Sequence, residues 1–116
     1  MGAVTYDFEI EQGATKNLRF VWKDSEAVPV DLTGCTARMQ LRRTVSSDTV
    51  VAELTTENGR IVLGGADGTV DVEFSAELTE QIAKNCVYDI ELVHGPVVTR
   101  LVQGAISVSR EVTRNG

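Results

Sequence analysis

His94 is the only histidine in the sequence and therefore the first candidate for proton transfer near neutral pH. It precedes Gly95 and Pro96, which predict a tight turn, so we expect its imidazole at an exposed loop tip. No serine stands in the Gly-x-Ser-x-Gly pattern of a nucleophile elbow, and the sequence offers no partners for a triad around His94. We therefore expect a protein that is not an enzyme.

A glycine-rich segment, residues 64–68, has the composition of a phosphate-binding loop. No Lys-Ser or Lys-Thr pair follows it, and the next residues alternate like a strand, so we interpret it as a turn. Asp67, Asp71 and Glu73 supply carboxylates, but their spacing matches no calcium-binding loop and is typical of a solvated strand face. The sequence thus predicts neither a cofactor nor a metal site.

The two cysteines, Cys35 and Cys86, each lie on the apolar phase of a predicted strand and do not form a Cys-x-x-Cys pair. Unpaired cysteine is among the most frequently buried residue types. We expect both to be reduced and structural, while a disulfide between their strands stays open.

The elements that would position these residues are mostly strands. The chain has 116 residues, which predicts one domain over 1–116, and its Val, Thr and alternating apolar residues favour pleated surfaces. The organising segment is 29–43. From Cys35 its residues alternate, with Ala37, Met39 and Leu41 on an apolar face.

Similar alternation predicts strands before and after this segment. Asn58-Gly59 favours a type I′ hairpin turn that would join neighbouring antiparallel strands. The phase of the apolar residues changes within 97–112, which predicts a β-bulge or a strand break at Gly104. The other expected strands are 4–10, 18–22, 50–56, 60–63, 70–74 and 86–93.

One short helix is expected over 76–84, with Ser75 as its N-cap and Leu78 and Ile82 facing inward. Residues 113–116 should form a loose tail. About eight short strands with one helix near 76–84 predict an all-β fold, an antiparallel β-sandwich of immunoglobulin-like size. A closed barrel is the alternative.

The net charge of −6 argues against a nucleic-acid or anionic-membrane partner, because such surfaces need clustered Lys and Arg. No apolar run is long enough for a membrane span, and no leader pattern opens the sequence, so we expect folding in a cytoplasm.

Charged residues gather in rows on the outer strand faces. One reading is that the rows keep these faces soluble and pair across neighbouring strands. The other is a charge-patterned surface for docking a protein partner. The candidate partner-binding residues are the basic Arg38, Arg42 and Arg43 and the acidic Asp7, Glu9 and Glu11; a second acidic row is Asp89 and Glu91.

Several motifs occur together along nearly the whole chain. They are Gln12-Gly13-Ala14-Thr15, Phe20-x-Trp22-Lys23-Asp24, Pro29-Val30-Asp31-Leu32-Thr33-Gly34, Ala37-Arg38-Met39-Gln40-Leu41-Arg42, the stretch 53–61, the Gly64-Gly65 turn, Val87-Tyr88-Asp89-Ile90-Glu91-Leu92, and the closing Val98-Thr99-Arg100-Leu101 with Val112-Thr113-Arg114. As a set they resemble small β-sandwich structural proteins of tailed bacteriophages, similar to the N-terminal domain of phage baseplate upper proteins.

The resemblance implies a virion protein that folds in the host cytoplasm and then docks, in several symmetric copies, onto other virion proteins at the tail or baseplate. Its role there would be that of an adaptor or a fibre-attachment module. A capsid decoration protein is one alternative. A carbohydrate-binding or adhesion module is another, for which Trp22 and Tyr6 are the stacking candidates, although both lie on apolar strand phases.

Overall fold

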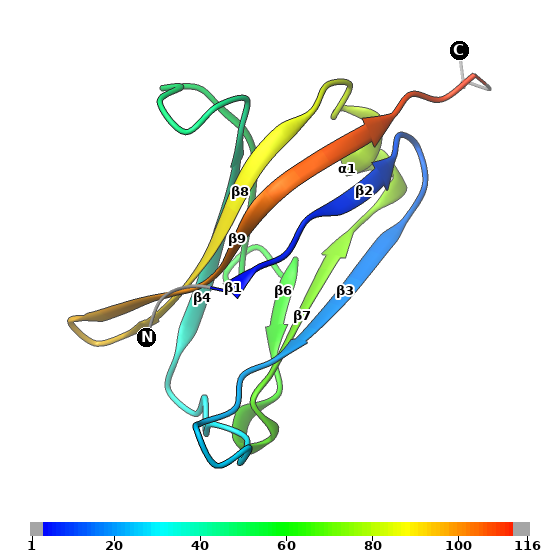
Figure 1. Cartoon of the computed structure of the whole chain (residues 1–116). Coiled ribbons are helices and arrows are strands. Elements are labelled where there is room, and N and C mark those ends of the chain that lie inside the picture. Colours follow the sequence, from blue (N-terminus) through cyan, green and yellow to red (C-terminus); the bar gives the residue numbers. More distant parts are fainter. Residues whose placement is uncertain (1–3, 113–116) are drawn as a thin grey trace.

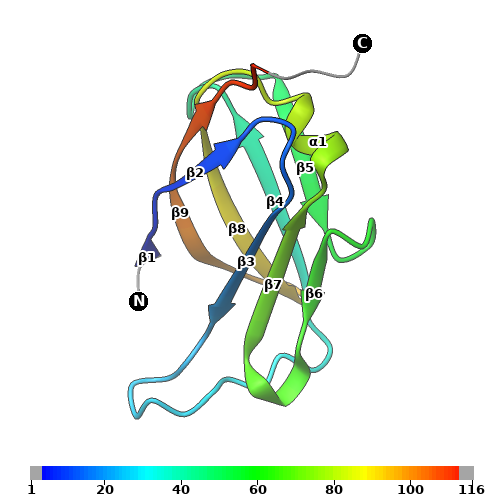
Figure 2. The same ribbon diagram turned by 90° about the vertical axis from the view of Figure 1, so that its right-hand side faces the viewer.

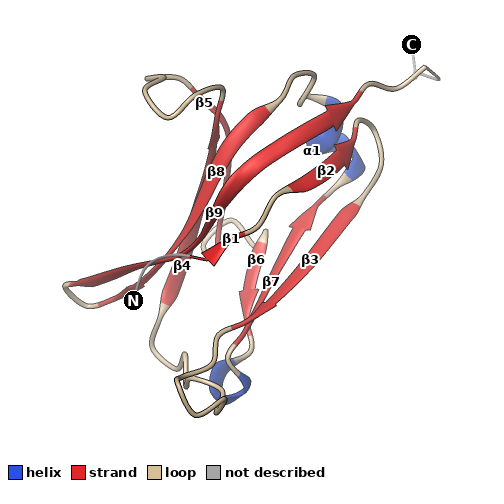
Figure 3. Cartoon of the chain, in the orientation of Figure 1, coloured by secondary structure: helices blue, strands red, loops and turns tan. Residues whose placement is uncertain are grey.

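The computed structural model describes residues 4–112 and shows two facing β-sheets with one short α-helix at one end (Figure 1). The sheets contain nearly all of the regular structure, and loops join them at both ends (Figure 3). The prediction of an all-β sandwich is confirmed. The chain order of the strands in this part is β1 Val4–Thr5, β2 Phe8–Glu11, β3 Lys16–Val21, β4 Thr36–Arg42, β5 Val50–Thr55, β6 Ile61–Leu63, β7 Thr69–Phe74, β8 Cys86–His94 and β9 Val97–Ser109.

The larger sheet has six strands and the smaller sheet has three. The larger one runs β1-β9-β8-β4-β5, with β2 also pairing with β9, and the smaller one runs β3-β7-β6. The short 3-10 helix Gly65–Asp67 links β6 to β7, so the glycine-rich segment is a turn as expected.

The first strand differs from the prediction. We predicted one strand over 4–10, but the backbone breaks at Tyr6 and Asp7 into β1 and β2, and both pair with β9 in parallel. β3 belongs to the other sheet, so β2 and β3 separate after their connecting turn (Figure 2). Val4 and Tyr6 are therefore 64% and 44% exposed, although their phase predicted a core position.

The core lies between the sheets and is built from the predicted apolar phases. On β4 the side chains of Ala37, Met39 and Leu41 are at most 1% exposed, as the alternation in that strand predicts. Phe74 of β7 is fully buried and faces Phe8 of β2, with the ring centroids 6.1 Å apart. Burial of alternate residues on both sheets supplies most of the stabilisation, because each large apolar side chain contributes about 1.5–3 kcal/mol.

The helix α1 spans Ala76–Glu80 and is shorter than the expected 76–84. The backbone amide of Leu78 donates to the Ser75 hydroxyl at 3.1 Å, so the predicted N-cap is confirmed. Thr79 is completely buried, and its hydroxyl accepts from the amide of Gly13 at 3.1 Å and donates to the carbonyl of Ala14 at 2.9 Å. These bonds hold the β2–β3 turn against the helix.

The hairpin prediction at Asn58-Gly59 is wrong. β5 lies in the larger sheet and β6 in the smaller one, so this turn crosses between the sheets. Gly59 has a positive φ of 79°, but Asn58 uses its side chain to accept hydrogen bonds from the amides of Thr55 and Arg60. An Asn side chain that bonds to nearby backbone stabilises such a turn without the two positive φ angles of type I′.

The irregularity predicted at Gly104 lies elsewhere. β9 runs unbroken through Gly104, and the register shift occurs at Leu101, an extra residue between the Ile90–Val102 and Glu91–Arg100 pairs. Leu101 and Val102 are consequently both buried. Gly104 has another role: a Cβ at this position would overlap the carbonyl oxygen of Tyr6, so the glycine lets the β1–β2 segment approach β9.

Candidate interaction surface

The residues with possible chemical roles do not form one site in the described part of the chain. His94 is exposed at the β8–β9 turn, and no three His, Cys, Asp or Glu side chains within 4–112 could hold a metal ion. Cys35 and Cys86 are free thiols. They precede Thr36 and Val87, which lie at opposite ends of the β4–β8 ladder, so roughly 20 Å of strand separates them and a disulfide is ruled out.

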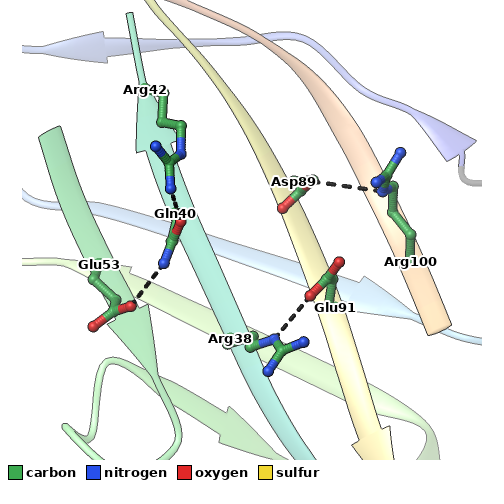
Figure 4. Close-up of polar contacts among 7 residues, drawn as sticks. All are labelled: Arg38, Gln40, Arg42, Glu53, Asp89, Glu91 and Arg100. Atoms are coloured by element: carbon green, nitrogen blue, oxygen red, sulfur yellow. Dashed lines mark hydrogen bonds and ion pairs between the residues drawn. The ribbon is translucent and has the colours of Figure 1, made fainter. Parts of the chain in front are cut away.

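The outer face of the larger sheet carries most of the predicted basic row. Arg38 on β4 forms an ion pair with Glu91 on β8, with Nε and Oε1 2.8 Å apart (Figure 4). Arg100 on β9 lies 3.6 Å from Asp89 on β8. Thus the row of Asp89 and Glu91 lies between cations on both sides, which is the arrangement expected of soluble faces that pair across strands.

Arg42 is the exception in this row. Its guanidinium donates to the carbonyl of Ser47 at 2.7 Å. It also donates to the amide oxygen of Gln40 at 2.9 Å, and Gln40 in turn donates to Glu53 (Figure 4). Arg42 forms no ion pair with any residue in 4–112. Its charge is held in place by neutral acceptors and is not cancelled by a carboxylate of its own.

Arg42 and Arg100 both line a hollow of about 500 Å³ on this outer face. Gln40, Asp89 and Gln103 also contribute to its walls, together with Val45, whose side chain is 88% exposed. The hollow therefore combines two guanidinium groups, two amide side chains, the Asp89 carboxylate that faces Arg100, and an exposed apolar group. These are groups that recognise a carboxylate-bearing segment of another protein.

The other candidates lie away from this hollow. Arg43 is exposed, and its Nε donates to the carbonyl of Asn85 at 3.2 Å. Asp7 accepts a hydrogen bond from the amide of Ala105 at 2.8 Å, so it ties the break between β1 and β2 to β9. Glu9 and Glu11 are exposed on β2. The structure does not bring the predicted basic and acidic residues together into one site.

Arg100, Gln103 and Val45 were not among the predicted site residues. Arg100 pairs with the β8 row only because β9 neighbours β8 in an antiparallel ladder. The tight turn at 94–96 was a signal for that pairing in the sequence, since a short turn joins antiparallel neighbours.

Burial is the main cause that raises the pKa of the Asp89 carboxyl above its ordinary value; Glu91 adds to it, and Arg100, Arg38 and Arg42 oppose it. A raised pKa in the folded state means that this group stabilises the fold at low pH and loses that contribution as the pH rises through the folded value. Relative to Asp89→Asn, the wild type should therefore become less stable as the pH rises from about 4, the ordinary pKa of Asp, through the raised folded value. Urea unfolding of both proteins across this range measures the difference, and a difference that grows in favour of the wild type would contradict the assignment.

None of the helices within residues 4–112 is long and apolar enough to cross a membrane. No protein-family model matches the sequence, and no curated protein matches it either.

Proposed function

We propose that the protein is a structural, non-enzymatic component of a tailed-bacteriophage virion that docks onto other virion proteins at the tail or baseplate. It would act there as an adaptor or a fibre-attachment module. The virion assignment rests on the resemblance of the sequence motifs to phage β-sandwich proteins. The docking role rests on the hollow between Arg42 and Arg100.

The hollow supports docking because the Arg42 guanidinium is held in place by neutral acceptors and forms no ion pair within residues 4–112. A guanidinium that is already oriented by Ser47 and Gln40 loses little conformational freedom when a partner carboxylate binds. Arg100 is only loosely held by Asp89 at 3.6 Å, so it too has donors available. The partner segment that fits is acidic, with an apolar side chain to cover Val45.

The test uses virions assembled with wild-type protein and with the double variant Arg42→Glu/Arg100→Glu. Copies per virion, measured by quantitative mass spectrometry, should fall more than about tenfold in the variant, since breaking close charge pairs at an interface costs more than about 1.4 kcal/mol. The matched control is Arg110→Glu, an exposed reversal after β9 and outside the hollow. Full incorporation of the folded double variant would refute docking through this hollow.

Cryo-electron microscopy of the wild-type virions tests the location. Density for the protein at the tail or baseplate is the expected result. Density spread over the capsid lattice would replace the adaptor role with capsid decoration, and absence of the protein from virions would defeat the proposal. Trp22 packs against the core, and the Tyr6 ring lies edge-on to Phe20 at 5.6 Å, so we do not propose the carbohydrate-binding alternative.

A further inference from the structure

Strand β3 is an edge strand of the smaller sheet and pairs only with β7 in the described part of the chain. Just after it, the amide of Trp22 donates to the carbonyl of Gly68, at the start of β7, at 2.8 Å. Backbone groups of successive strand residues point alternately to the two sides, so those of Asn17, Arg19 and Val21 point away from β7. Within residues 4–112 these outward groups have no hydrogen-bond partner.

Apolar side chains follow the same edge. Leu18 and Phe20 point inward from β3 but are only partly buried. The Tyr6 ring, which meets Phe20 edge-on, is 44% exposed, and Val21 is 46% exposed. A central strand with this sequence would bury its inward side chains completely, so the sandwich is incompletely covered beside β3.

The strand order shows at which end the smaller sheet could be extended. β6, at one end of the smaller sheet, packs against β4, and β3 is the strand at the other end of that sheet. At that end the larger sheet finishes with β1 and β2, and the Tyr6 ring between them meets Phe20 of β3 edge-on. A strand added at the free edge of β3 would lie beside this aromatic contact, in the layer that faces β1 and β2.

The edge strand β5 of the larger sheet differs from β3, because side chains bond to its outward backbone groups. Its outward groups near the C-terminal end are already bonded: Thr55 donates its amide to Asn58 Oδ1 at 3.0 Å. The Glu53 carbonyl accepts from Asn58 Nδ2 at 3.1 Å and from Arg60 Nη1 at 2.9 Å. Side chains that occupy an edge in this way prevent strand addition, and β3 has no such protection.

We propose that the β3 edge binds a single extended segment of a partner protein, which adds to the smaller sheet as its fourth strand. The segment has apolar residues at alternate positions, which cover Phe20 and Tyr6, and a carboxylate opposite Arg19. β7 shows this chemistry on the other side of β3: Asp71 faces Arg19 in register and accepts from its Nε at 2.6 Å and its Nη2 at 3.0 Å. Arg19 keeps further donors for a second carboxylate, and Lys16 adds positive charge to the same strand.

The probe is a synthetic peptide with the sequence of β7, Thr-Val-Asp-Val-Glu-Phe, added to the intact protein. NMR titration should give saturable shifts at Asn17, Arg19 and Val21. With peptide at about ten times its Kd, hydrogen exchange at these three amides should slow about tenfold, because exchange then occurs only from the free fraction. A version with Lys in place of Asp and Glu should bind more weakly, since it faces Arg19 with a like charge.

Val21→Pro removes one outward amide and leaves the pairing with β7, so it should stay folded and lose peptide binding. Val21→Thr keeps the amide and the side-chain shape and should bind as the wild type does. The proposal fails if the wild-type amides show no saturable shift, if their exchange is unchanged at saturation, or if Val21→Pro binds normally. These readouts need no virion, so they are independent of the docking hollow.

Discussion

Replacing Phe74 with alanine should lower the free energy of unfolding by about 3–5 kcal/mol, the largest effect that we expect from a single apolar substitution in this protein. The side chain is fully buried on β7, and its ring faces Phe8 across the sandwich at 6.1 Å. Its removal loses the transfer free energy of the ring and leaves a cavity between two sheets that cannot collapse onto each other. Urea unfolding followed by circular dichroism measures the change.

The matched control is Val62→Ala on β6, the neighbouring strand of the same sheet. Val62 is 59% exposed, so its truncation should change the free energy of unfolding by no more than about 0.5 kcal/mol. Equal losses in the two variants would mean that the core does not lie between the sheets as described.

Gly104→Ala should destabilise the protein by about 1–3 kcal/mol, although it adds only a methyl group. The new Cβ would overlap the Tyr6 carbonyl oxygen and lie 2.8 Å from Asp7 Oδ1, so the β1–β2 segment has to move away from β9. That movement also disturbs the bond from the Tyr88 hydroxyl to the Tyr6 carbonyl. Thermal unfolding and the amide shifts of residues 4–8 report the two effects.

Gly64→Ala is the control for this substitution. Neither glycine has a positive φ, so backbone strain does not distinguish them. The added Cβ at 64 meets the hydroxyl of Thr69, a side-chain group that can rotate away, whereas the one at 104 meets backbone. A larger loss at Gly64 than at Gly104 would speak against the close approach of the β1–β2 segment to Gly104 of β9.

Local patterns in the sequence predicted most elements correctly. The alternation from Cys35 to Arg42 predicts β4 and its buried face, because period-two burial is a property of one strand alone. The N-cap at Ser75 is equally local and is confirmed, although the helix ends earlier than expected. In β9 the phase change was real, but its position was wrong, since two buried neighbours, Leu101 and Val102, place the extra residue before Gly104.

The local patterns did not predict which strands pair with each other. Asn58-Gly59 is a strong hairpin signal, yet the strands on either side of it lie in different sheets. β1 and β2 alternate like one strand, but the residues at 6 and 7 break it where it passes Gly104 of β9. Which sheet a strand joins depends on contacts between distant residues, and a sequence period does not contain them.

The candidate surface also combines features that the local sequence predicts with features that depend on which strands pair. The rows Arg38 to Arg42 and Asp89 to Glu91 were visible in the sequence, and the β4–β8 ladder brings them side by side. Arg100 joins them only through β9, and Glu9 with Glu11 lies beyond β9 on β2. A charge row is therefore a local feature, whereas the hollow between Arg42 and Arg100 is a property of the sheet order.

The parallel pairing of β1 and β2 with β9 also has a consequence for folding kinetics. Phe8 pairs with Ile106 and Glu11 with Ser109, so one edge of the larger sheet is closed by residues that lie almost a full chain length apart. Such high contact order slows folding, because loop-closure entropy is lost before the contacts form. During synthesis, β2 has to wait until β9 has left the ribosome, and the apolar face of Phe8 and Ile10 needs another cover until then.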